Sequence, residues 1–113
     1  MFFDELRRMI DAGRGNQWLD YEKMAVYVRV GKRMIHGELK TCVQIANVAA
    51  PPKFQGKGIF TRLLQEIKET TDLPIYVEQI LNQRFFDALL RRGFVPPRHY
   101  DGEIYDLVLI TEA

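Results

Sequence analysis

The order of segments between residues 41 and 80 constrains the fold of this chain most strongly. Residues 41–49 alternate imperfectly between apolar and polar side chains and predict a central strand, and Pro51-Pro52 cannot continue a strand ladder. A loop with two glycines then enters a segment whose apolar residues follow helical spacing to about residue 71, and residues 74–80 predict a second strand. Because a strand, helix and strand unit closes as a right-handed crossover, these two strands are expected to be parallel.

Two further helices are expected on either side of this unit. Residues 2–12 repeat apolar side chains at helical spacing and stop at Gly13, and residues 13–17 predict a polar connector. Asn82 is the expected N-cap of a second helix, which ends at Gly93. The apolar residues of that helix are Phe85, Phe86, Leu89 and Leu90.

The remaining segments predict antiparallel strands. Residues 23–30 and 33–36 are rich in β-branched and aromatic side chains and are expected to pair across a turn at Gly31-Lys32. The chain is expected to turn again at residues 36–38, and residues 105–110 predict the last strand. Together the segments predict an α/β fold, with a mixed, mostly antiparallel central sheet, one parallel βαβ unit and flanking helices.

A chain of 113 residues is expected to form one domain with a single core, residues 1–113. We divide it into four successive parts. These are an N-terminal helix and connector (1–22), antiparallel strands (23–49), a ligand-binding unit (50–94) and a loop with the last strand (95–113).

Composition excludes several classes of protein. The 16 basic and 15 acidic residues leave a net charge near +1, so nucleic acid is not an expected partner. The single Cys42 forms neither an internal disulfide nor a zinc site, and no metal is expected. The N-terminus does not resemble a signal peptide, and no apolar run approaches the ~20 residues that cross a bilayer. We therefore expect a cytoplasmic protein with no membrane partner.

The glycine loop before the central helix predicts an anion site, since helix N-termini present free backbone N–H groups. It is not a Walker loop, because Lys57 lies between Gly56 and Gly58 and no Lys-Ser or Lys-Thr pair follows. It is not a dinucleotide loop either, because Phe60 and Thr61 follow where that pattern needs glycine. Neither ATP nor NAD is the expected ligand.

Two motifs resemble those of the GNAT superfamily of N-acetyltransferases. VAAPPKFQGKGIFTRLL is similar to the acyl-CoA loop [QR]xxGx[GA] at a helix start, with Gln55 and Gly58 at fixed positions and Phe60 where glycine or alanine is usual. NQRFFDALLRRGF resembles NxxAxxLYxxxGF, with Asn82 and Gly93-Phe94 at the family spacing. The resemblance covers roughly residues 22–110 and implies a GNAT-like fold.

The resemblance implies acetyl-CoA as cosubstrate. It places the pyrophosphate on the loop amides and the pantetheine arm along the end of the preceding strand. Because Phe60 departs from the family pattern, we predict separately that its ring lies on the core side of the first helical turn rather than against the pyrophosphate. The residues that it implies in cofactor binding are Val48, Ala49, Ala50, Gln55, Gly56, Lys57, Gly58, Ile59, Phe60, Thr61 and Asn82. Basic side chains near the pyrophosphate loop are Lys53, Lys57 and Arg62. Those of the following helix are candidates for contact with the 3′-phosphate or with an acidic substrate surface, namely Arg84, Arg91 and Arg92. Without a ligand, the glycines would serve a tight turn and Asn82 a helix cap.

The resemblance also implies catalytic roles. Glu78 is the first candidate for the general base, with His36, Glu38 and His99 as alternatives. Leu89 occupies the position where many relatives carry a tyrosine that acts as the general acid. Tyr105 is our candidate for that acid, and Tyr100, Tyr76 or water are alternatives.

The expected function is therefore transfer of an acetyl group from acetyl-CoA to a primary amine of a small molecule, peptide or protein, by direct attack in a ternary complex. Trp18, Tyr21 and the segment 91–105 are expected near the acceptor entrance. The alternative is a non-catalytic GNAT-like module that binds CoA or a protein partner, and a small inhibitor or nucleic-acid binder ranks third. A homodimer is left open.

Overall fold

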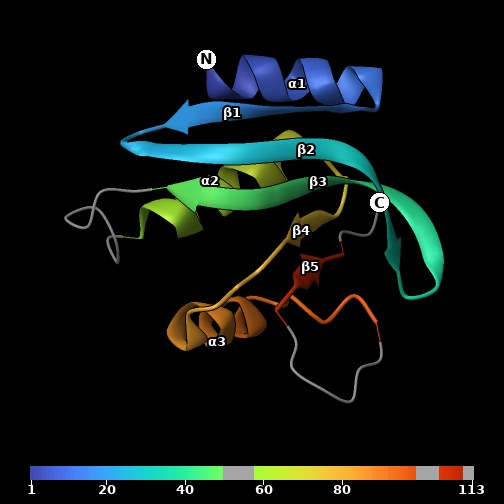
Figure 1. Ribbon diagram of the computed structural model, residues 1–113, viewed down its shortest axis with the longest axis vertical. Coiled ribbons are helices and arrows are strands. Elements are labelled where there is room, and N and C mark those ends of the chain that lie inside the picture. The colour runs from blue at the N-terminus through green and yellow to red at the C-terminus, as the bar shows by residue number, and fades with distance from the viewer. Residues whose placement is uncertain (50–57, 99–104, 111–113) are drawn as a thin grey trace.

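The computed structural model describes residues 1–49, 58–98 and 105–110. Its elements follow the order α1 (Phe2–Ala12), β1 (Gly15–Tyr21), β2 (Met24–Ile35), β3 (Glu38–Ala49), α2 (Ile59–Thr70), β4 (Ile75–Val77), α3 (Gln83–Arg91) and β5 (Leu107–Leu109) (Figure 1). No helix in this described part is long and apolar enough to cross a membrane.

The five strands form one mixed sheet in the order β1-β2-β3-β4-β5. β3 and β4 are parallel, and the other three neighbouring pairs are antiparallel. The α2 crossover lies between the two parallel strands along the chain, as the sequence predicts. The expected mixed α/β fold class is confirmed, and it is consistent with a GNAT-like fold.

The N-terminal segment contains a strand that the sequence does not reveal. Helix α1 ends at Gly13 as predicted, but the predicted connector at residues 13–17 is wrong, because β1 begins at Gly15. β1 pairs with β2 from Gly15 opposite Val30 to Tyr21 opposite Met24. Its polar start hides it, since an edge strand that buries one face needs few apolar residues.

The predicted turn at Gly31-Lys32 is also wrong, because β2 runs without a break from Met24 to Ile35. The carbonyl of Gly31 accepts a hydrogen bond from the Gln44 side-chain amide at 3.3 Å, so this glycine lies beneath a side chain of β3. The turn predicted at residues 36–38 is confirmed, and it joins β2 to β3.

The last two strands are shorter than predicted. β4 covers only Ile75–Val77 of the expected 74–80, and β5 only Leu107–Leu109 of the expected 105–110. Helices α2 and α3 match their predicted extents closely. The sequence therefore locates β4 correctly but does not show that it leaves the sheet after Val77.

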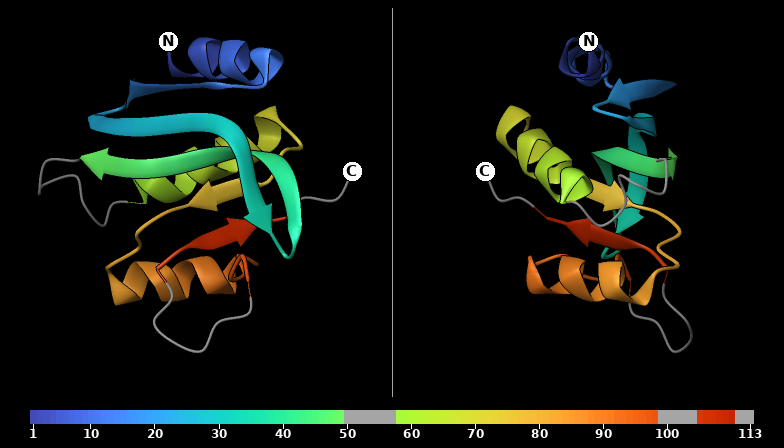
Figure 2. Two further views of the ribbon diagram at one scale, coloured as in Figure 1. Left: turned by 45° about the vertical axis from the view of Figure 1, so that its right-hand side comes forward. Right: turned by 90° about the vertical axis from the view of Figure 1, so that its left-hand side faces the viewer.

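The two faces of the sheet bury different side chains. The helical face, represented by Val28, Val43, Ile45, Ile75 and Val77, packs against apolar side chains of all three helices in the main core. Figure 2 shows α1 and α2 on the same side of the sheet. The polar face is defined by Arg29, Arg33, Gln44, Tyr76 and Glu78, and its small buried apolar cluster comes from strand residues alone: Ile35, Cys42, Tyr76 and Val108.

Candidate functional site

The central feature of the site is the point where the two parallel strands part. Their pairing ends at Ile45 opposite Val77, and the backbone N–H of Glu78 donates to the Ile45 carbonyl at 3.0 Å. β3 nevertheless continues to Ala49, where it still pairs with β2. The register between β2 and β3 shifts beside Tyr27, which leaves Ala46 as an extra residue in β3. Such a bulge bends a strand, and here it coincides with the parting.

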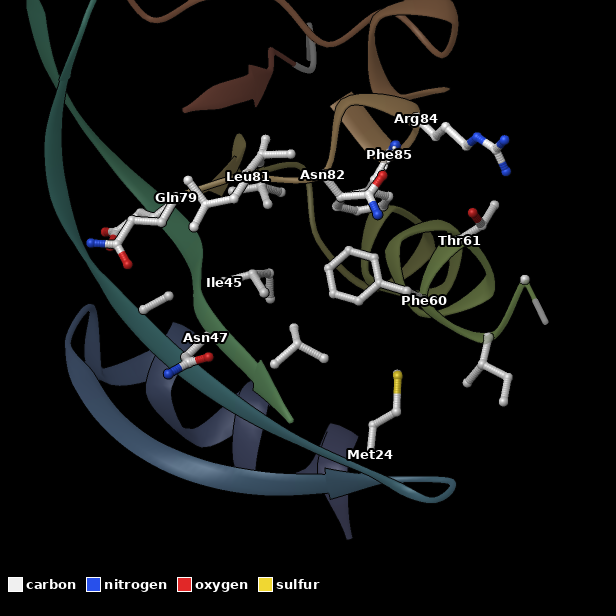
Figure 3. A pocket seen from close by; sticks show the side chains of 17 residues that line it. Met24, Ile45, Asn47, Phe60, Thr61, Gln79, Leu81, Asn82, Arg84 and Phe85 are labelled. Atoms are coloured by element: carbon white, nitrogen blue, oxygen red, sulfur yellow. Dashed lines mark hydrogen bonds between the residues drawn. The ribbon is translucent and has the colours of Figure 1, made fainter. Parts of the chain in front are cut away.

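A cleft of about 840 Å³ lies where the strands part (Figure 3). The ends of β3 and β4 and the starts of α2 and α3 surround it. Its apolar lining residues are Met24, Ile45, Val48, Ile59, Phe60, Val77, Ile80, Leu81 and Phe85. Its other lining residues are Ala46, Asn47, Gly58, Thr61, Glu78, Gln79, Asn82 and Arg84. The volume and the mixture of apolar walls with a few polar groups are typical of small-molecule sites.

The start of α2 presents backbone donors to this cleft. Gly58 is the N-cap at φ 75°, a left-handed conformation that favours glycine, and the first intrahelical bond runs from the Arg62 N–H to the Gly58 carbonyl at 3.0 Å. The helix therefore supplies no acceptor for the N–H groups of residues 59–61. Its first turn has no acidic residue, and no described side chain caps it. These donors and the helix dipole suit an anion.

Phe60 lies inside the cleft and contacts the neighbouring helix. Its ring meets the ring of Phe85 edge to face, with centroids 4.9 Å apart. Both rings also pack against the main core. Figure 3 shows the Phe60 ring directed from α2 towards Asn82 and Phe85. The position agrees with the expected core-side location.

Asn82 both caps helix α3 and lines the cleft. Its side-chain oxygen accepts a hydrogen bond from the Phe85 N–H at 3.0 Å, so its predicted role as N-cap of α3 is confirmed. The amide of Asn82 faces the cleft in Figure 3. The cap uses only the oxygen, so the amide nitrogen adds a hydrogen-bond donor to the lining of the cleft.

Glu78 is the most firmly held polar side chain in the site. Its two carboxylate oxygens each accept a hydrogen bond from Nη2 of Arg29 at 2.7 Å, and Oε1 also accepts one from Arg33. The Glu78 side chain is only 12% exposed. The carboxylate therefore lines the cleft as predicted, but both of its oxygens are already engaged by guanidinium groups.

The other candidates for proton transfer lie elsewhere. Tyr105 is 43% exposed and is not among the described lining residues of the cleft, although its carbonyl accepts from the Ile80 N–H at 2.6 Å. The Tyr76 hydroxyl donates to Asp106 at 2.9 Å, and burial followed by that bond raises the pKa of Tyr76. Leu89 is buried in the main core.

The alternative bases and the basic residues are distributed unevenly. His36 bonds the Pro96 carbonyl at 2.8 Å and Glu38 pairs with Lys40, both at the β2–β3 turn rather than the cleft. Of the basic candidates, Arg84 lines the cleft, whereas Arg62 binds Glu22 and the Tyr21 hydroxyl. Seven predicted residues lie outside the described ones: Ala50, Lys53, Gln55, Gly56, Lys57, His99 and Tyr100.

Several residues of the cleft escaped the sequence analysis. Ala46, Asn47, Gln79 and Leu81 line it because of the bulge in β3 and the early end of β4. Gln79 has a φ of 53°, which turns the chain away from β3. Glutamine has no preference for this conformation, so the sequence does not predict the change of direction after Val77.

Comparisons with known proteins support the fold. The chain matches no protein-family model and no curated protein. Among solved structures it is similar to a point mutant of KacT, an acetyltransferase of the GNAT superfamily, with a TM-score of 0.54 and 13% identity over 90% of this chain and 74% of that chain. It also matches a KacTA–DNA complex, with a TM-score of 0.49 and 17% identity over 93% and 78% of the two chains. At these identities the likeness shows the fold alone.

Proposed function

We propose that this protein is an N-acetyltransferase that takes its acetyl group from acetyl-CoA and transfers it to a primary amine. The observation that carries the proposal is the parting of β3 and β4 over a cleft bordered by two helix starts. The likeness of the fold to KacT supports acetyl transfer at a general level.

The described residues fit an acyl-CoA. Residues 58–61 offer the backbone donors and the helix dipole for a pyrophosphate, and Arg84 adds a positive charge to the same cleft. Val48 and Ala49 lie at the end of β3, which pairs with no described strand on the β4 side beyond Ile45, and this edge suits an amide-containing arm. The apolar walls suit the alkyl parts of that arm.

Bound acetyl-CoA supplies an acetyl thioester, which is reactive towards a neutral amine. The chain contributes position, since a cleft that orients both reactants lowers the entropic cost of their encounter. Backbone donors at the parted edge of β3 would polarise a carbonyl held there. The C–N bond forms as the C–S bond breaks, and we propose that the proton lost by the amine passes through water to the departing thiolate, which is a tolerable leaving group near neutral pH. Tyr105 is not placed in this step, because it is not among the described lining residues of the cleft.

A second candidate is a module that binds acyl-CoA without turnover. Two observations favour it over a transferase. Leu89 is buried where many relatives place a tyrosine, and Glu78 is occupied by Arg29 and Arg33. Both candidates predict acetyl-CoA binding, and only the first predicts a product.

The proposal is tested by adding acetyl-CoA to the purified protein, with ATP and NAD as controls. Acetyl-CoA alone should raise the unfolding midpoint, because a ligand at about a hundred times its dissociation constant adds about 2.7 kcal/mol to stability. Gly58→Glu should abolish the shift and Gly58→Gln should retain most of it, since the two variants share bulk and backbone strain and differ in charge.

Turnover separates the two candidates. A panel of amines is incubated with acetyl-CoA, and release of CoA is followed together with the mass of the acetylated product. A product from any amine supports the transferase, and a midpoint shift without product from the panel favours the binding module. No shift with acetyl-CoA would contradict both.

A further inference from the structure

The polar face carries a network of charged side chains that ends at the parting of the strands. Arg29 and Arg33 both come from β2, and Glu78 follows β4, so the bonds between them pass over β3, which lies between those strands. Gln44 of β3 lies within this network, because its side-chain oxygen accepts from Arg33 at 3.4 Å. Three adjacent strands are therefore tied together at one level of the sheet.

The network continues from Arg33 to β5. The Arg33 guanidinium lies over the Tyr76 ring, 4.4 Å from its centroid, and donates to the Tyr76 hydroxyl at 3.3 Å. Asp106 accepts from that hydroxyl through Oδ2 and from the Gln79 N–H through Oδ1, at 2.9 and 3.0 Å. The same set of bonds thus reaches the first residue after Glu78.

These bonds act where the chain changes direction. After Glu78, Gln79 adopts its positive φ and the Ile80 N–H bonds the Tyr105 carbonyl, so the chain passes to the β5 side. A left-handed conformation is unfavourable for glutamine and persists only where its surroundings hold it. The hydrogen bonds to the Glu78 carboxylate and from the Gln79 N–H stabilise this conformation of Gln79.

We infer that Arg29, Arg33 and Glu78 form a clamp that ties the end of β4 across β3 to β2, and so fixes Gln79 as the point where the chain turns away from β3 and the cleft opens. Glu78 is then a positioning residue, whose two carboxylate oxygens both bond guanidinium groups of β2. The clamp itself is independent of any ligand, and its effect on acetyl-CoA binding rests on the proposed function. Preorganised walls of this kind lower the cost of ligand binding.

Amide hydrogen exchange of the full chain tests the clamp without a ligand. In Arg33→Met and in Glu78→Gln, exchange at Gln79 and Ile80 should rise at least about tenfold, while Val43 and Ile45 stay within about twofold, because only the local opening changes. Arg33→Lys keeps the charge and should give an intermediate rise, and it serves if Arg33→Met does not fold. Arg8→Met removes an exposed ion pair of α1 and is the matched control, with no change expected.

Two exchange results would overturn the inference. One is unchanged exchange at Gln79 and Ile80 in both Arg33→Met and Glu78→Gln. The other is an equal rise at Val43 and Ile45, which would mean general destabilisation.

Binding adds a second readout by calorimetry with acetyl-CoA. The dissociation constant should rise about tenfold in both Arg33→Met and Glu78→Gln, the change that about 1.4 kcal/mol produces, and stay within about twofold in Arg8→Met. A catalytic base at Glu78 predicts the opposite pattern, in which Glu78→Gln lowers kcat and leaves binding and exchange unchanged. If the unmodified protein does not bind acetyl-CoA, the proposed function fails, and exchange alone decides the clamp.

Discussion

The two faces of the sheet are stabilised in different ways. The helical face is a continuous apolar core, in which side chains such as Val28, Ile45 and Leu63 are fully excluded from water. The polar face carries charged groups with defined partners, and its buried apolar cluster is small. The first face therefore holds the fold together, while the second determines where β4 leaves the sheet and where the cleft forms.

Apolar side chains of the polar face are buried although no described helix covers that face. The β2–β3 turn comes back against the segment before β5, because the His36 N–H donates to the Pro97 carbonyl at 2.7 Å and its ring bonds the Pro96 carbonyl. Ile35 and Cys42 are thereby fully buried beside Val108. Curvature of two long strands replaces a covering helix here.

The largest expected effect comes from breaking the helical face. Leu63→Ala in α2 removes a fully buried side chain from the main core and should lower the free energy of unfolding by about 2–5 kcal/mol. Urea denaturation measures the change. Leu39→Ala, at a residue that is 64% exposed, is the control and should change stability by less than about 0.5 kcal/mol. Equal losses in the two variants would contradict the account of this face.

The next effect tests burial on the polar face through pH. Desolvation raises the pKa of Cys42 to about 11 from its ordinary value of 9.0. Between these values the unfolded chain loses the thiol proton while the folded chain keeps it, so stability falls as pH rises. Over these 2 units the loss should be on the order of 2 kcal/mol relative to Cys42→Ala. Parallel stability curves for the two proteins from pH 9 to 11 would show that the thiol is not desolvated.

Two glycines on opposite faces should respond to alanine with effects of opposite sign, and the gain at Gly31 is the smallest effect expected. Gly15 faces α1 at φ 146°, and a Cβ there would lie 2.7 Å from the Met9 Cγ, so Gly15→Ala should destabilise by about 1–3 kcal/mol. Gly31 lies on the polar face, where a Cβ would have ordinary contact with Gln44 at 3.7 Å. Gly31→Ala should therefore stabilise by about 0.4–1 kcal/mol, as measured by thermal unfolding. Effects of the same sign would contradict the described packing.

Periodic and capping signals make much of this fold predictable. The apolar spacing of α1, α2 and α3, the cap at Asn82 and the crossover between β3 and β4 all follow from local sequence, because each depends on residues close along the chain. β1 and the unbroken β2 do not, since an edge strand beginning with Gly15 and Asn16 and a mid-strand Gly31 resemble turns. Their pairing is fixed by tertiary contacts.

The candidate site divides in the same way. The glycine at the start of α2 and the position of Glu78 after β4 can be predicted from the sequence, because the spacing of the two motifs places them. The engagement of Glu78 by Arg29 and Arg33 is not, because these arginines are 49 and 45 residues away along the chain and meet it only across the sheet. The bulge at Ala46 has no local signal either.

The most direct test of the proposed site is to map acetyl-CoA on the protein through backbone amide chemical shifts. The account predicts that the largest shifts fall on residues 46–49 of β3 and residues 58–61 of α2, with small shifts on β1 and the β2–β3 turn. At saturating acetyl-CoA, the amide chemical shifts of β1 and of the β2–β3 turn should remain close to those of the free protein. Shifts centred on the polar face, or none at saturating acetyl-CoA, would contradict the assignment of the cleft between β3 and β4 as an acyl-CoA site.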